Sequence, residues 1–131
     1  MKSDVKILIV DDNEQDQKII GHILGRMGLR NLSYASNGAE AIQKAATEQP
    51  DLIVLDTVLP DFDGFEVLAQ IKSRQTKTEI KTKTVMMTGS IEAVKAFEAG
   101  KAASLGVDDY VAKTADFTAL TESIRKLLSL E

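Results

Sequence analysis

The stretch DLIVLDTVLPDFDG, residues 51–64, decides the fold. Its first part, Asp51–Asp56, predicts a β-strand that is apolar throughout Leu52–Leu55. A strand that is apolar at every position is covered on both faces, which is typical of parallel sheets. The segment Pro60–Gly64 then predicts a turn before the next helix. The stretch therefore indicates a strand that lies between two layers of helices.

Strand and helix patterns alternate along the rest of the chain. The predicted strands are Val5–Val10, Leu32–Ala35, Asp51–Asp56, Thr84–Met87 and Asp109–Ala112. Each is followed by apolar residues at helical spacing, within Ile19–Met27, Ala41–Ala46, Phe65–Ile71, Ile91–Leu105 and Phe117–Leu127. Either Ser36 or Asn37 is suited to cap the second helix. Strict alternation predicts an α/β fold with a doubly wound five-stranded parallel sheet and helices on both faces.

Length and composition limit the classes of protein to consider. The 131 residues predict a single domain, with a core over about residues 5–128 and no attached output domain. A net charge of −4 argues against direct nucleic-acid binding, and the absence of cysteine excludes disulfides and thiolate metal sites. The apolar runs are far shorter than a membrane-spanning helix requires. We expect a cytoplasmic protein that does not insert into a membrane.

Polar residues stand where the predicted strands end. Ligands of open parallel sheets bind at this carboxyl edge. The residues are Asp11 and Asp12 after the first strand, Asp56 at the end of the third, Thr88 and Gly89 after the fourth, and Lys113 after the fifth. Three neighbouring carboxylates repel one another unless a cation lies among them, and oxygen ligands favour Mg²⁺, Mn²⁺ or Ca²⁺. A hydroxyl and an ammonium group beside such a cation suit phosphoryl oxygens.

This set of residues resembles the receiver domain of two-component response regulators, the flavodoxin-like fold of the chemotaxis (CheY-like) regulators. The resemblance covers about Val5 to Leu128. It is carried by Asp11-Asp12, Asp56, Thr88, Tyr110 and Lys113 in this order, with Pro60 and Gly64 after the third strand. The combination is specific, whereas a single Asp-Asp pair would not be.

The resemblance implies a role for each residue at the strand ends. Asp56 would be the phosphoacceptor, and the donor would be a sensor histidine kinase or a phosphotransfer protein. Asp12, Asp56 and the backbone carbonyl of Val58 would bind Mg²⁺, with Mn²⁺ as the alternative, and Asp11 would act largely through water. Lys113 and the Thr88 hydroxyl would contact the phosphoryl group, and Gly89 would donate its backbone N–H.

The resemblance also implies a phosphorylation-driven switch. Thr88 would move toward the phosphoryl group, and Tyr110 would then turn inward. This would repack the surface formed by the fourth helix, the fifth strand and the fifth helix, through which a downstream protein would bind. The chain would thus be a phosphoprotein of a signalling phosphorelay, and not an enzyme beyond its own phosphorylation and dephosphorylation.

The chain departs from the family pattern in three places, one of which is the connection Ser73–Lys83, which lacks the proline often found before the fourth strand. Thr114 stands where the family usually has a proline joined by a cis peptide bond, so we expect a trans Lys113–Thr114 bond and an altered loop path. The segment Ala96–Val107 is a few residues longer than usual. These differences leave the reach of Lys113 and the shape of the output surface open.

Two other functions compete with the phosphoacceptor. One is a degenerate receiver that acts as an interaction scaffold without phosphorylation. The other is a Mg²⁺-dependent phosphohydrolase with an aspartate nucleophile, but these enzymes need a second aspartate where this chain has Val58. Asp61 and Asp63 are interpreted as turn residues, and His22 has no partner at ligand spacing.

Overall fold

The strand predicted from Asp51–Asp56 lies in the middle of the sheet. In the computed structural model, which describes residues 4–74, 82–89, 106–114 and 116–129, this strand is β3, Leu52–Asp56, and all five of its residues are buried. The other strands are β1 (Lys6–Val10), β2 (Asn31–Ala35), β4 (Lys83–Thr88) and β5 (Asp109–Ala112). The described helices are α1 (Glu14–Arg26), α2 (Gly38–Glu48), α3 (Gly64–Ser73) and α5 (Thr118–Leu127).

The strands form a parallel sheet in the order β2-β1-β3-β4-β5, with every neighbouring pair parallel. The predicted fold class is therefore confirmed. The chain crosses from β1 to β2 on one side and continues from β3 to β5 on the other, so the strand order reverses between β1 and β3. Such a reversal point is where open α/β sheets bind their ligands.

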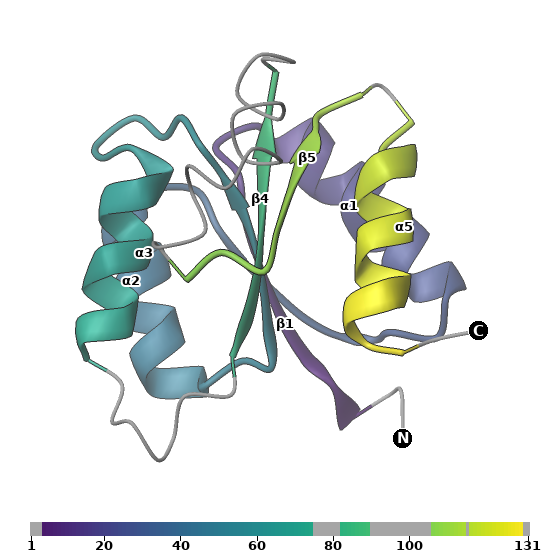
Figure 1. Ribbon diagram of the computed structural model, residues 1–131, viewed down its shortest axis with the longest axis horizontal. Helices are drawn as coiled ribbons and strands as arrows, with labels where there is room; N and C mark the ends of the chain where they lie inside the picture. The colour runs from purple at the N-terminus through teal and green to yellow at the C-terminus, as the bar shows by residue number, and fades with distance from the viewer. Residues whose placement is uncertain (1–3, 75–81, 90–105, 115, 130–131) are drawn as a thin grey trace.

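The helices cover both faces of this sheet (Figure 1). Alternate residues of each strand point to opposite faces. Leu8, Ile53 and Met86 belong to the core beneath α2 and α3. Ile9, Val54 and Met87 belong to the core shared with α1 and α5. This two-sided burial explains why the central strands are apolar at every position.

The structure selects one of the two predicted caps of α2 and corrects the predicted start of α5. Asn37 caps α2, with its side chain accepting a hydrogen bond from the Glu40 N–H at 2.8 Å. Phe117 is not part of α5: it is the N-cap residue, with φ 53°, although its side chain stays buried at 2% exposure. The helix predicted at Ile91–Leu105 lies outside the described residues. Within the described ranges, no helix has the length and apolar character needed to cross a membrane.

Candidate functional site

The parallel register brings the polar strand ends to one edge of the sheet. Val10 of β1 pairs with Leu55 of β3, so Asp11 and Asp56 follow side by side. Asp56 in turn pairs with Met87 of β4, and Thr88 pairs with Ala112 of β5. Lys113 comes directly after β5. The four strands that carry these residues are therefore adjacent, as the strand-end rule predicts.

Three carboxylates meet at this edge. Asp11, Asp12 and Asp56 each offer an oxygen, and these oxygens all lie within 4.8 Å of one another. Asp11 is fully buried, Asp56 is 8% exposed, and Asp12 faces solvent. Burial raises the pKa of Asp11 more than its hydrogen bonds from Lys113 and the Asn13 N–H lower it. The negative charge of the buried Asp11 carboxylate is thus incompletely compensated by its hydrogen bonds. A set of carboxylate oxygens of this kind fits a hard cation such as Mg²⁺.

The Lys113 ammonium group lies among these acids. Its Nζ donates to Asp11 Oδ2 at 2.7 Å and to Asp56 Oδ2 at 3.0 Å. A third carboxylate, Asp16 Oδ2 of α1, lies 3.0 Å from the same nitrogen. Burial lowers the pKa of Lys113, but the hydrogen bonds with the three acids outweigh it and hold the pKa above its usual value. Lys113 is therefore a fixed positive charge at the site.

Thr114, which follows Lys113, does not prevent the Lys113 side chain from reaching the site. The Lys113–Thr114 peptide bond is trans, as predicted from the absence of proline. The Lys113 N–H donates to the Thr88 carbonyl at 2.6 Å, which holds the start of the loop against the end of β4. The side chain consequently reaches Asp56 without the cis bond that the family pattern would supply.

The loop after β3 is built around Gly64. A Cβ atom on Gly64 would lie 2.4 Å from the backbone oxygen of Asp56, so only glycine allows this approach. The Gly64 N–H donates to the Thr57 carbonyl at 2.8 Å, and Val58 forms a bridge with Asp63. The loop thus folds back on the end of β3. It leaves the Val58 side chain 73% exposed at the rim of the acidic cluster.

The remaining predicted residues lie along β4 and β5. Thr88 is the last residue of β4 and is 5% exposed, and Gly89 follows it at the surface. Tyr110 of β5 is 6% exposed, and its ring stacks on that of Phe65 with centroids 5.9 Å apart. Tyr110 is therefore already packed inward.

Asp61 connects the loop after β3 to α2. Its carboxylate accepts hydrogen bonds from the Gly38 N–H at 2.7 Å and the Ala39 N–H at 3.0 Å, at the start of that helix. Asp63 caps α3 by accepting from the Glu66 N–H at 2.8 Å. The interpretation of both as turn residues holds for Asp63 and is incomplete for Asp61. We did not predict the Asp61 contact because its partners are 22 and 23 residues away in the chain.

The Asp61 contact predicts a pH-dependent effect on stability. Desolvation of the Asp61 carboxylate raises its pKa, but the N–H groups that it faces, chiefly those of Ala39 and Gly38, outweigh this and lower the pKa overall. A lowered pKa means that the carboxylate stabilises the fold above its usual pKa, and that this stability is lost as the pH falls through the folded value. Asp61→Asn is therefore expected to lower the melting temperature by a few degrees at pH 7. The difference should shrink as the pH falls below the usual aspartate pKa of 3.8 and disappear only below the lowered pKa of the folded state. A difference that stays constant with pH would contradict this assignment.

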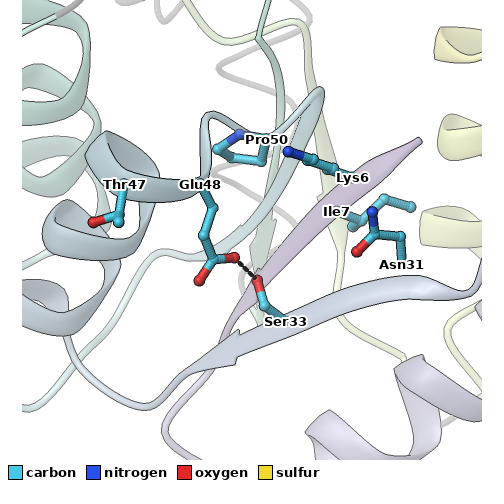
Figure 2. Close-up of a pocket in the computed structure, with 7 residues that line it drawn as sticks. All are labelled: Lys6, Ile7, Asn31, Ser33, Thr47, Glu48 and Pro50. Carbon is cyan, nitrogen blue, oxygen red and sulfur yellow. Dashed lines mark hydrogen bonds between the residues drawn. The ribbon is translucent and has the colours of Figure 1, made fainter. Parts of the chain in front are cut away.

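A pocket of about 380 Å³ lies at the other end of the sheet (Figure 2). It is lined by residues at the amino-terminal ends of the first two strands, among them Lys6 and Asn31. Among the described residues that line it, Glu48 carries the carboxylate, which accepts a hydrogen bond from the Ser33 hydroxyl at 2.6 Å. These lining residues include no cluster of acids like that at the carboxyl edge, so the pocket is not part of the candidate site.

Comparisons with known proteins agree with this arrangement. The family model described as "Response regulator receiver domain" matches residues 7–125. The alkaline phosphatase synthesis transcriptional regulatory protein PhoP of Bacillus subtilis is 41% identical over 108 residues, which is 82% of this chain and 42% of PhoP. The response regulator protein VraR of Staphylococcus saprophyticus is 33% identical over 97% of this chain and 58% of VraR. The chain thus spans about half the length of these curated relatives.

Solved structures show the same fold. The response regulator TrrA of Thermotoga maritima, in complex with Mg²⁺-BeF, superposes with a TM-score of 0.76 at 28% identity, covering 94% of this chain and 98% of TrrA. A putative response regulator of Chloroflexus aurantiacus has a TM-score of 0.77 at 27% identity, covering 95% and 98% of the two chains. The fold and the strand-end residues thus lead to the same group of proteins.

Proposed function

The chain belongs to the family of response regulator receiver domains of two-component systems, and from this premise we propose that it accepts a phosphoryl group on Asp56. One observation carries the proposal: Asp56 ends the central strand with its carboxylate 3.0 Å from the Lys113 ammonium, inside a cluster of acids that fits Mg²⁺. The phosphodonor is a histidine kinase or a phosphotransfer protein. A cytoplasmic location is part of the same proposal.

Mg²⁺ would be held by Asp12, Asp56 and the Val58 carbonyl, with Asp11 acting through water. When bound, the ion neutralises negative charge on the phosphoryl oxygens and on the acids around them. Mn²⁺ has similar ligand preferences and is the alternative ion. The fit rests on the oxygen-only cluster of Asp11, Asp12 and Asp56.

Each side chain of the site would have its own role in the phosphoryl transfer. A carboxylate oxygen of Asp56 forms a bond to phosphorus, and the bond from phosphorus to the imidazole nitrogen of the donor breaks. The electron pair of the broken bond stays on that nitrogen, which takes up a proton from solvent, so that the donor leaves with a neutral imidazole. Lys113 donates to a phosphoryl oxygen, and the Thr88 hydroxyl and the Gly89 N–H donate to the others. Positioning and charge neutralisation supply most of the rate enhancement in such transfers.

The proposed output is a change of surface. Movement of Thr88 toward the phosphoryl group leaves space that Tyr110 occupies more fully, which biases the packing of β5 and α5. Because Tyr110 already packs inward on Phe65 in this structure, the proposed switch requires an outward position of Tyr110 that phosphorylation would disfavour. The helix expected at Ile91–Leu105, which would complete this surface, lies outside the described residues. A downstream protein would recognise the changed surface, and action without an attached output domain stays a prediction.

The experiment that tests the phosphoacceptor role uses the purified chain. Incubation with Mg²⁺ and acetyl phosphate is expected to add one phosphoryl group, detected by intact mass spectrometry, and chelation of Mg²⁺ with EDTA should prevent the addition. Reductive trapping of the acyl phosphate should locate it at Asp56. A chain that stays unmodified under these conditions would contradict the proposal and favour the scaffold function.

A further inference from the structure

Asp16 is a fourth acid at the site. It lies in the first turn of α1, and its Oδ2 is 3.0 Å from Lys113 Nζ, the same distance as Asp56 Oδ2. The side chains of Asp16 and Lys113 are 24% and 21% exposed, so the pair is partly shielded from water. Neither the family resemblance nor the strand-end rule gives Asp16 a role, because it follows no strand.

The Lys113 ammonium group is shared among three carboxylates: it donates hydrogen bonds to Asp11 and Asp56 and forms an ion pair with Asp16. An ammonium group carries three N–H donors and no acceptor. Three carboxylates surround the nitrogen: Asp11 at 2.7 Å, and Asp16 and Asp56 at 3.0 Å each. When Asp56 takes up a phosphoryl group, the donor that faced its carboxylate becomes available for a phosphoryl oxygen. The contact with Asp16 can persist through this exchange, so the charge of Asp16 acts both before and after transfer.

The count of charges at the site shows what Asp16 contributes. The carboxylates of Asp11, Asp12, Asp16 and Asp56 oppose the single ammonium of Lys113, which leaves a formal charge of −3 from four negative groups and one positive group. Without Asp16 the formal charge would be −2. A more negative site attracts a divalent cation more strongly and repels a phosphodonor dianion more strongly.

We propose that Asp16 is a positioning residue that opposes the positive charge of Lys113 and thereby favours Mg²⁺ binding at the expense of phosphodonor capture. The inference rests on the proposed phosphoacceptor function. It adds a residue of α1 that sets the balance between the two ligands of the site. Because the effects on cation and anion have opposite signs, a general loss of structure cannot imitate them.

The test compares Asp16→Asn with Glu14→Gln. Both replacements remove one negative charge from the first turn of α1. Glu14 is exposed, and among the described residues it is not one of the acids paired with Lys113. Calorimetric titration with Mg²⁺ alone is expected to show a dissociation constant about threefold higher for Asp16→Asn, as the size of a partly exposed ion pair suggests. At saturating Mg²⁺, the second-order rate constant with acetyl phosphate should rise about threefold, again from the energy of such a pair. Both changes should shrink at about 1 M salt, where the Debye length is roughly 3 Å.

Each outcome decides the question. Opposite shifts in Asp16→Asn that are absent from Glu14→Gln support the inference. Equal effects in the two variants would mean that the general charge of α1 is the cause. Weaker Mg²⁺ binding together with slower transfer in Asp16→Asn would mean that structure is lost. Either outcome overturns the proposed role of Asp16. If the wild-type chain forms no adduct, the proposed phosphoacceptor function is wrong, and the inference about Asp16 falls with it. If the wild type reacts and Asp16→Asn behaves as the wild type does, only the inference about Asp16 fails.

Discussion

Asp56→Asn is expected to abolish the phosphoryl adduct that the wild-type chain forms with Mg²⁺ and acetyl phosphate. The amide oxygen of asparagine lacks the negative charge that makes a carboxylate a nucleophile for phosphorus. The change also removes one of the three carboxylates that cluster within 4.8 Å, so Mg²⁺ should bind more weakly. Asparagine has nearly the shape of aspartate and keeps an acceptor for Lys113. Intact mass spectrometry over the same time course as the wild type measures the result.

The matched control for this variant is Asp51→Asn. Asp51 lies just before the same strand at the opposite edge of the sheet, where its carboxylate accepts from the Lys6 N–H at 2.9 Å. This control removes the same charge without touching the site, so its adduct should form at the wild-type rate. Thermal melts should show both variants folded. Adduct formation by folded Asp56→Asn would contradict the assignment of Asp56 as the acceptor.

Strand burial made most of the fold predictable. The run Leu52–Leu55 identified the central strand because only a strand covered on both faces is apolar at each position. The predicted ends of the strands and helices are less accurate. In the structure, β4 has one more residue at each end, Lys83 and Thr88, than the predicted strand Thr84–Met87. Backbone pairing with β3 and β5, which a single sequence does not display, sets these limits. The apolar spacing predicts that Phe117 belongs to the last helix, but its positive φ puts it just before α5.

The site was predictable as far as it depends on strand ends. Asp11, Asp56, Thr88 and Lys113 come together because the carboxyl ends of parallel strands share one edge. Asp16 was missed because its partner Lys113 lies across the sheet edge and not within α1. No local pattern indicates this contact, because Asp12 lies before α1 and Lys113 is 97 residues after Asp16 in the chain. Contacts of this kind depend on how the layers pack, which periodicity does not define.

Lys113→Met is expected to have the largest effect on stability. The replacement has a similar length but leaves Asp11, which is fully buried, without its ammonium partner. Removing one partner of a buried ion pair costs about 3–5 kcal/mol, and the partial exposure of Lys113 reduces this to about 2–4 kcal/mol of the free energy of unfolding. Urea unfolding at pH 7.5 in EDTA measures the loss. Lys18→Met removes an exposed lysine of α1, and a surface change of this kind should shift the free energy by no more than about 0.5 kcal/mol.

The pH and Mg²⁺ dependence of Lys113→Met identify the cause of the lost stability. Burial already raises the pKa of Asp11 in the wild type, and removal of the Lys113 hydrogen bond takes away a contribution that lowers it. A carboxylate with a raised pKa binds its proton more tightly in the folded state, so the stability of the variant should recover as the pH falls from 7.5 toward 5. Mg²⁺ supplies a positive charge to the same acids and should stabilise the variant more than the wild type. If the deficit is the same at both pH values and with or without Mg²⁺, lost packing and not unbalanced charge is the cause, and Lys113 is not the counter-ion of the acidic cluster.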